Sequence, residues 1–249
     1  MKKNGKTLSV IMPSFNEGAH IRKNVVETWE TLEKAWGGPF EIIVVDDGSS
    51  DNTHAEALAA SRTHPHIKVV HYKVNRGKGG ALKEGFMSAE GDYVAFLDAD
   101  LDLHPSQIPA LFKVMEEKGA QIVIGSKHHP SSALKYPAHR RLISRVYAIA
   151  LKLLFKLPVR DTQTGLKIFK AEVLKRIFPK VVCARYAYDL EILANAHRLG
   201  YTIAEAPIVL NFQRVAKWGR IRTKDLYRAG MDTLAIFYRM YFTGHYKGI

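Results

Sequence analysis

The stretch YVAFLDADLDLHP (residues 93–105) joins a short apolar run to carboxylates at alternate positions, Asp98, Asp100 and Asp102. An apolar run of this length is typical of a strand buried on both faces. Carboxylates packed so closely repel one another unless a cation or a proton lies between them. A divalent ion such as Mg²⁺ or Mn²⁺ would relieve that repulsion and could bridge phosphate oxygens. Solvated loop charges and a helix start near Pro105 are the alternatives, and we favour the metal site.

Similar apolar runs recur through the first half of the chain and alternate with segments of helical periodicity. The runs are LSVIMPS (8–14), EIIVVDD (41–47), IKVVHYK (67–73) and QIVIGS (121–126), and the helical segments span residues 17–36, 52–62, 78–89 and 105–118. Strands that alternate with helices predict an α/β fold with a doubly wound, mostly parallel sheet and helices on both faces. In such sheets, ligands bind outside the carboxyl ends of the strands.

Two more of these strands end in conspicuous polar groups, PSFNE (13–17) and DDGSSDN (46–52). Part of this chemistry fits helix capping, and we expect Ser14 or Asn16 to cap the helix that follows. If one of these residues caps the helix, Glu17 is left to accept a hydrogen bond from a sugar hydroxyl. Capping does not explain two adjacent acids at the end of an apolar strand, so one of them is expected to face a ligand crevice.

The segment NRGKGGALKEG (75–85) resembles a phosphate-binding loop. It lacks the lysine-then-hydroxyl ending of a Walker loop, which argues against an ATPase. We expect its glycines to allow close packing below the crevice, while Arg76 or Lys78 reaches toward the ligand.

The charge of the chain is unevenly distributed. Residues 1–124 carry a net charge of −3 and residues 125–249 one of +16, within a total of +13 over 249 residues. The second half is therefore expected to face an anionic partner: nucleic acid, a phospholipid surface or a phosphorylated ligand. A single cysteine, Cys183, indicates a reducing compartment, and no stretch predicts a signal peptide or a membrane span.

After residue 127 the strand–helix alternation breaks down. Residues 139–157 (HRRLISRVYAIALKLLFKL) predict an amphipathic helix with a basic stripe, which we interpret as interfacial rather than as ordinary core packing. We then expect a loop (RDTQTGLK), a helix over residues 186–200, a strand over 201–210, a basic turn and a final aromatic helix near 222–242. This part is a C-terminal amphipathic helical elaboration of one domain.

Taken in order, PSFNE, DDGSSD, NRGKGGAL, DADLD, GSK, DTQTGLK and YAYDLE resemble the landmarks of glycosyltransferase family 2. The resemblance covers roughly residues 7–215 and implies a GT-A fold and a nucleotide-sugar donor. Within the family the chain most resembles the dolichyl- or polyprenyl-phosphate hexose synthases. The resemblance implies a GT-A domain over residues 1–215, and we interpret residues 216–249 as a lid and membrane contact.

Positions in the chain take their roles from this resemblance. It places the nucleotide-sugar against Pro13, Phe15, Glu17, Val45, Asp47, Asp98, Ala99 and Asp100. Asp98 would face the donor sugar, and Asp100 with Asp102 would hold Mg²⁺ or Mn²⁺. Lys127 and Arg140 match the family positions for an acceptor phosphate. Phe15 stands where the family usually has tyrosine, and Asp102 where mannosyl enzymes often have glutamine.

Departure of a diphosphate requires neutralisation of its charge. Lys217 and Arg220 in RVAKWGRIR (214–222) are candidate cations for this role, and Gly219 between them is consistent with a flexible lid. An equally weighted alternative is that this segment is a basic loop that faces a membrane. A hydroxyl acceptor also needs a base, for which Asp189 is the first candidate and Asp161 the second. A lipid phosphate is already ionised and needs none.

The sequence thus predicts an inverting, metal-dependent transferase that moves a hexose from a UDP- or GDP-hexose to a polyprenyl or dolichyl phosphate, located in the cytoplasm and peripherally bound to an anionic membrane. The alternative is a soluble enzyme of the same family that acts on a sugar, protein or small-molecule hydroxyl. A nucleic-acid-binding protein is disfavoured, because acidic strand ends would repel phosphate without a metal.

Overall fold

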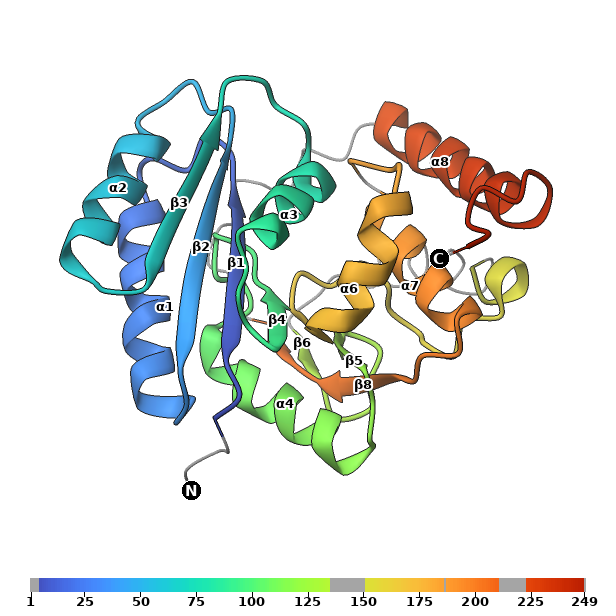
Figure 1. Ribbon diagram of the computed structural model, residues 1–249, viewed down its shortest axis with the longest axis horizontal. Helices are drawn as coiled ribbons and strands as arrows, with labels where there is room; N and C mark the ends of the chain where they lie inside the picture. Colours follow the sequence, from blue (N-terminus) through green and yellow to red (C-terminus); the bar gives the residue numbers. More distant parts are fainter. Residues whose placement is uncertain (1–4, 135–150, 186, 211–222, 249) are drawn as a thin grey trace.

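The computed structural model describes residues 5–134, 151–185, 187–210 and 223–248 and shows an α/β fold (Figure 1). Its main sheet has seven strands in the order β3-β2-β1-β4-β7-β5-β8. The strands are β1 (Leu8–Ser14), β2 (Phe40–Asp47), β3 (Ile67–Tyr72), β4 (Tyr93–Phe96), β5 (Ile122–Ser126), β7 (Lys167–Lys170) and β8 (Ile203–Pro207). A small second sheet pairs β6 (Ala133–Leu134) with β9 (Val209–Leu210). The doubly wound, mostly parallel sheet predicted from the sequence is confirmed.

The central strands are buried on both faces, which is why their sequences read as continuous apolar runs. Val10 of β1 packs on one face and Ile11 on the other, and both are fully buried. β1 pairs in parallel with β2 and with β4, so the carboxyl ends of these strands meet at one edge of the sheet.

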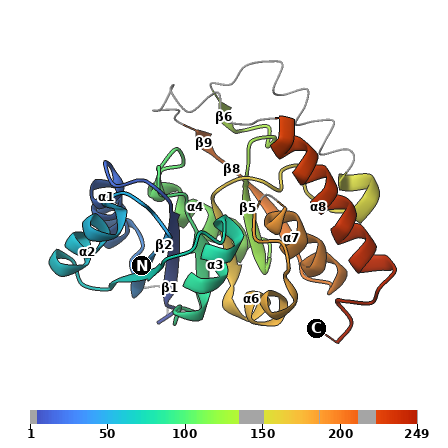
Figure 2. The ribbon, with the colours of Figure 1, turned by 90° about the horizontal axis from the view of Figure 1, so that it is seen from above.

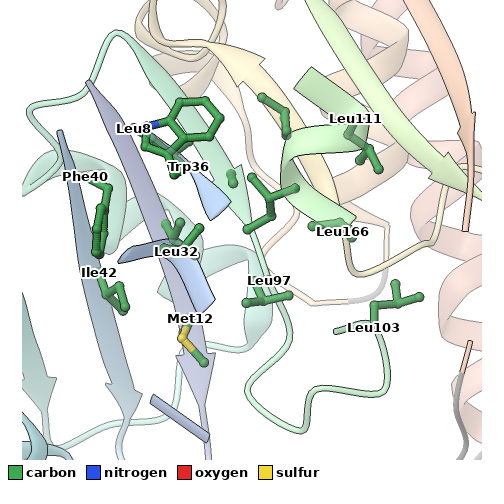
Figure 3. Close-up of a cluster of buried hydrophobic side chains, with 14 of the residues drawn as sticks. Leu8, Met12, Leu32, Trp36, Phe40, Ile42, Leu97, Leu103, Leu111 and Leu166 are labelled. Atoms are coloured by element: carbon green, nitrogen blue, oxygen red, sulfur yellow. The ribbon is translucent and has the colours of Figure 1, made fainter. Parts of the chain in front are cut away.

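Helices cover both faces (Figure 2). One face is packed by α1 (Ile21–Ala35), α2 (Thr53–Thr63) and α4 (Ile108–Glu117), and the other by α3 (Lys78–Met87), α6 (Ala171–Ile177), α7 (Tyr188–Arg198) and α8 (Thr223–Tyr241). In α1, Ile21, Val25 and Leu32 recur at helical spacing and form its buried stripe. Figure 3 shows Leu32 and Trp36 against Leu8 and Met12 of β1.

Sequence analysis missed β6, α6 and one strand of the main sheet, β7. It lies antiparallel between β4 and β5, and α6 follows it directly. The expected strand over residues 201–210 divides into β8 and β9, and the predicted helix over 186–200 corresponds to α7.

Residues 139–150 of the predicted interfacial helix lie outside the described residues. Its last part, 151–155, is helical, and Leu151 and Phe155 are buried there. The Phe155 ring lies 6.0 Å from that of Phe237 in α8, so this end of the helix packs on the core. Among the described residues, none of the helices is both long and apolar enough to cross a bilayer.

Candidate functional site

Two adjoining pockets open at the carboxyl ends of β1, β2 and β4. The first has a volume of about 250 Å³ and is lined by Pro13, Ser14, Phe15, Glu17, Asp47, Lys78, Asp98, Ala99 and Asp100. The second has a volume of about 440 Å³ and is lined by Phe15, Asp47, Asn75, Gly77, Lys78, Gln163, Arg185, Tyr188 and Asp189. Phe15, Asp47 and Lys78 belong to both. The structure thus brings together seven of the residues that the family resemblance assigned to the nucleotide-sugar: Pro13, Phe15, Glu17, Asp47, Asp98, Ala99 and Asp100.

The acidic segment after β4 alternates buried and half-buried side chains. Ala99, Leu101 and Leu103 pack into the core, whereas Asp98, Asp100 and Asp102 are half-buried. The backbone N–H of Asp102 donates to Oδ1 of Asp100 over 3.3 Å. Because Leu101 has a φ of 54°, the chain turns here instead of continuing the strand, which ends at Phe96. Asp98 and Asp100 line the first pocket, whereas Asp102 lies outside its lining.

Asp98 forms an ion pair with Lys78, the first residue of α3. Burial disfavours the ionised form of Asp98, but the positive charge of Lys78 outweighs burial and lowers the pKa of the Asp98 carboxyl below its ordinary value. Burial also opposes the charge of Lys78, yet Asp98 and Asp189 raise the pKa of the Lys78 ammonium. Both groups are consequently charged at neutral pH.

Asp47 lines both pockets, but its carboxylate already has several partners. Oδ1 accepts from the Tyr72 hydroxyl at 2.7 Å and from Arg76 N–H at 2.7 Å. Oδ2 accepts from Asn75 Nδ2 and from Gly77 N–H, each at 2.9 Å. Asp47 thus holds the glycine-rich loop in place, while the side chain of its neighbour Asp46 points to the other face of the sheet.

The glycine-rich loop contacts the segment that leads into α7. The backbone N–H of Gly79 donates to the carbonyl of Ala184 over 2.8 Å, and a Cβ at position 79 would lie 2.6 Å from Cβ of Tyr188. Close packing by the glycines is confirmed. Of the two candidate cations, Lys78 lines the pockets, whereas Arg76 pairs with Glu84 over 2.7 Å.

The prediction that Ser14 or Asn16 caps α1 is wrong. α1 begins at Ile21 after His20, which makes no side-chain cap. Asn16 instead accepts from Ser50 N–H through Oδ1 and donates its own N–H to Ser49 Oγ, each over 2.9 Å. These bonds tie the loop after β2 to the loop after β1, which contributes Phe15 and Glu17 to the first pocket.

At the base of the second pocket, Lys167 of β7 pairs with Asp189 of α7 over 2.7 Å, and both side chains are nearly fully buried. Burial lowers the pKa of the Lys167 ammonium, although Asp189 acts in the opposite direction. The second candidate base, Asp161, lies in neither pocket. Its Oδ2 accepts from Lys127 N–H at 3.0 Å and from the Thr164 hydroxyl at 2.7 Å, a bonding pattern that favours a positioning role.

The remaining predicted site residues either do not line these two pockets or lie outside the described residues. Val45 is fully buried beneath α3 and lines neither of these pockets, so its side chain supports the pocket floor. Lys127 also lies outside their lining, 3.7 Å from Asp161. Arg140, Lys217 and Arg220 lie outside the described residues.

Sequence reasoning missed several lining residues: Asn75, Gly77, Gln163, Arg185 and Tyr188. All of them lie within or beside landmarks that were recognised, NRGKGG, DTQTGLK and YAYDLE. The only sequence signal that could have identified these residues is their position within or beside the recognised motifs. Which of their residues face the ligand depends on how β7 and α7 return to the sheet.

Comparison with known proteins agrees with this geometry. Residues 9–178 match the model of the family described as glycosyl transferase family 2. The chain is 32% identical over 243 residues to a dolichyl-phosphate beta-glucosyltransferase of Trichomonas vaginalis, covering 92% of this chain and 70% of that protein. It is also 32% identical over 213 residues to the dolichyl-phosphate beta-glucosyltransferase of Dictyostelium discoideum, covering 81% of this chain and 65% of the relative.

A solved structure resembles the whole fold. It is glucosyl-3-phosphoglycerate synthase from Mycobacterium tuberculosis in complex with Mn²⁺ and uridine-diphosphate-glucose, with a TM-score of 0.69 and 25% identity over 95% of this chain and 79% of that chain. The chain therefore belongs to glycosyl transferase family 2, has the GT-A fold of that family, and is a nucleotide-sugar-dependent hexosyltransferase.

Proposed function

We propose that the protein transfers a hexose, with inversion, from a UDP-hexose to a polyprenyl or dolichyl phosphate at a membrane surface. The observation that carries this proposal is the first pocket, in which Asp98 and Asp100 stand beside Pro13, Phe15, Glu17 and Asp47. The UDP-hexose is supported by the solved relative, which is in complex with uridine-diphosphate-glucose. The lipid phosphate is supported by the names of the relatives that act on dolichyl phosphate.

The residues for a divalent cation are Asp100 and Asp102. Their carboxylates offer the hard oxygen donors that Mg²⁺ and Mn²⁺ prefer, and both lie on the half-buried segment after β4. This donor set fits the Mn²⁺ that the solved relative holds. When bound, such an ion would neutralise charge on the departing diphosphate.

The other pocket residues divide the remaining work. Lys78 places a positive charge between the two pockets, where it would attract the diphosphate. Asp98 stays ionised because of Lys78 and would accept hydrogen bonds from hydroxyls of the donor hexose. Glu17 and Asp47 form the side of the pocket that would hold the nucleoside.

A lipid phosphate acceptor requires cations and an apolar approach. Lys127 is retained as an acceptor-phosphate residue, together with Arg140. The outer side of α8 exposes a row of large apolar residues, Met231, Leu234, Tyr238 and Tyr241, and Phe242 directly after the helix is exposed as well. Leu153, in the helical segment beside α8, is 76% exposed (Figure 2). Exposed Lys152, Lys156 and Arg228 add positive charge, as a helix bound to an anionic membrane surface needs.

This arrangement would place the enzyme peripherally on the cytoplasmic face of a membrane. Residues 1–215 would form the catalytic domain, with residues 216–249 as lid and membrane contact. The second candidate is transfer to a hydroxyl acceptor. Asp189 favours it, because this carboxylate lines the second pocket and could serve as the base such an acceptor requires.

The test is donor turnover with matched acceptors. The purified chain is given Mn²⁺ and UDP-glucose, UDP-galactose or GDP-mannose, with polyprenyl phosphate in vesicles or with 3-phosphoglycerate. We expect a UDP-hexose to label the lipid, and Asp100→Asn to reduce turnover by about 10²–10³-fold, as for loss of a group that stabilises transition-state charge.

Asp92→Asn is the matched control, because Asp92 immediately precedes the same strand, β4, at its opposite end. It should keep full turnover. Labelling of only a water-soluble acceptor would leave the family assignment intact and overturn the lipid phosphate.

A further inference from the structure

A second cluster of metal-ligating side chains lies on the other face of the sheet from Asp47. It consists of Asp46 at the end of β2, His71 in β3 and His54 in the first turn of α2, and we refer to it as the imidazole cluster. Asp46 and His71 are paired in the register of the two parallel strands, so their side chains lie on the same face. α2 packs on that face and brings His54 to them.

The three side chains are within reach of one ion. One ring nitrogen of each histidine and a carboxylate oxygen of Asp46 all lie within 4.8 Å of one another. Nδ1 of His71 is 2.9 Å from Oδ2 of Asp46, and the two imidazole rings are 4.2 Å apart between centroids. Asp46 is fully buried, whereas His71 is exposed, so an ion here would have protein on one side and solvent on the other.

The cluster also contains a polar atom without a hydrogen-bond partner. Within the part of the chain that the structure describes, Nδ1 of His54 is buried and has no such partner. An imidazole nitrogen can bind a transition-metal cation, which the Asp46 carboxylate would share.

The ligand chemistry selects the class of ion. Imidazole nitrogen suits Zn²⁺ and its late first-row neighbours, whereas Mg²⁺ and Ca²⁺ prefer oxygen alone. We propose that the imidazole cluster binds a divalent transition-metal ion of the zinc class through Asp46, His54 and His71. This site is separate from the donor-site cation and does not depend on the acceptor proposed above.

Such an ion would stabilise the loops next to the first pocket from the other face of the sheet. Oδ1 of Asp46 accepts from Ser49 N–H over 3.1 Å, and Ser49 Oγ accepts from Asn16 N–H. Thr53, next to His54, accepts from Glu17 N–H over 2.8 Å. An ion that joins β2, β3 and α2 would therefore hold in place the loop after β1, which carries Glu17, and the loop after β2, which carries Ser49.

The test uses the whole chain freed of metal with a chelator and then titrated with Zn²⁺ and with Co²⁺ in the absence of nucleotide. Calorimetry gives affinity, and the visible absorption of Co²⁺ reports nitrogen and oxygen ligation. The variants are His54→Gln and His71→Gln. His20→Gln is the matched control, because His20 is exposed at the start of α1 and outside the cluster.

We expect a Zn²⁺ site in the wild type and in His20→Gln whose affinity falls more than about tenfold in either cluster variant, since even outer-shell partners of a metal contribute that much. Zn²⁺ should raise the Tm of the wild type and of the control but not of the cluster variants. Asp100→Asn should keep the site, which separates it from the donor-site cation. Affinity that is unchanged in either cluster variant, or the lack of any Zn²⁺ site in the wild type, would overturn the proposal.

Discussion

Gly165 lies directly against Asp98: a Cβ at position 165 would be 2.1 Å from Oδ2 of that carboxylate. This close approach explains why the DTQTG loop ends in glycine at the pocket. It also links the irregular second half of the chain to the acidic segment after β4, since only Leu166 separates Gly165 from β7.

Gly165→Ala should therefore displace Asp98. We expect kcat/KM to fall by about 10²-fold, because small misplacements of an active-site group cost that much, and stability to fall by about 1–3 kcal/mol. Steady-state kinetics and urea unfolding measure the two effects. Gly230→Ala is the control, because a Cβ there meets nothing within 4 Å. It should leave kcat/KM unchanged and, because Gly230 lies inside α8, should raise stability by up to about 1 kcal/mol instead of lowering it.

The buried pair of Lys167 and Asp189 gives a second prediction. Lys167→Met leaves the Asp189 carboxylate buried without its cation, and we expect a loss of about 3–5 kcal/mol in the free energy of unfolding. The double variant Lys167→Met/Asp189→Asn should be more stable than the single one, because it removes the unpaired charge. Exposed Lys175→Met on α6 is the control; equal losses in all three variants would contradict the prediction.

Glu41 predicts how stability changes with pH. Burial disfavours its ionised form, but Lys68 at 2.8 Å and the Ser9 hydroxyl at 2.6 Å together lower the pKa of the Glu41 carboxyl below its ordinary value of 4.5. A carboxyl with a lowered folded pKa stabilises the protein above pH 4.5, and this contribution disappears as the pH falls through the folded pKa.

Glu41→Gln should accordingly cost about 1–3 kcal/mol at pH 7, the range for hydrogen bonds to charged groups. The difference from wild type should shrink as the pH falls well below 4.5. Urea unfolding across this range measures it. Glu117→Gln, at an exposed pair 3.7 Å from Lys113, should change stability by less than about 1 kcal/mol. A difference that is constant with pH would be at odds with the lowered pKa.

The exposed side of α8 gives a prediction for membrane binding. Leu234→Gln and Phe242→Gln should each weaken binding to anionic vesicles by about tenfold or more, because each removes a side chain worth about 1.5–3 kcal/mol of apolar burial. Sedimentation with vesicles measures it. Met87→Gln replaces a residue at the end of α3 that is more exposed than either, and it should bind as wild type does. If all three variants bind alike, α8 is not the membrane contact.

The first half of the fold was predictable because its strands follow a simple rule. β1 and β2 are buried on both faces, so they read as uninterrupted apolar runs that end in polar residues. The site could be placed for the same reason, since parallel strands carry their carboxyl ends to one edge. Pro13, Asp47 and Asp98 consequently meet at the first pocket.

β7 could not be predicted by that rule. Only Ile168 and Phe169 are apolar in it, and Lys167 and Lys170 flank them. Lys167 is nonetheless buried, because a carboxylate from α7 accompanies it into the core. A charged residue reads as exposed unless its partner is known, and here the partner lies on another element. Tyr188 and Arg185 were not predicted as pocket residues for the same reason, since the positions of α7 and of the segment before it depend on the packing of α7 against β7.

The position of β7 has a consequence for biosynthesis. β5 emerges from the ribosome before β7, yet it pairs with β7 and β8 rather than with any earlier strand of the sheet. β1 to β4 can assemble early, while β5 has to wait for some 40 further residues to be made. We therefore expect nascent chains that stop before Lys167 to expose open edges on β4 and β5, and to be the species most prone to aggregate or to engage chaperones.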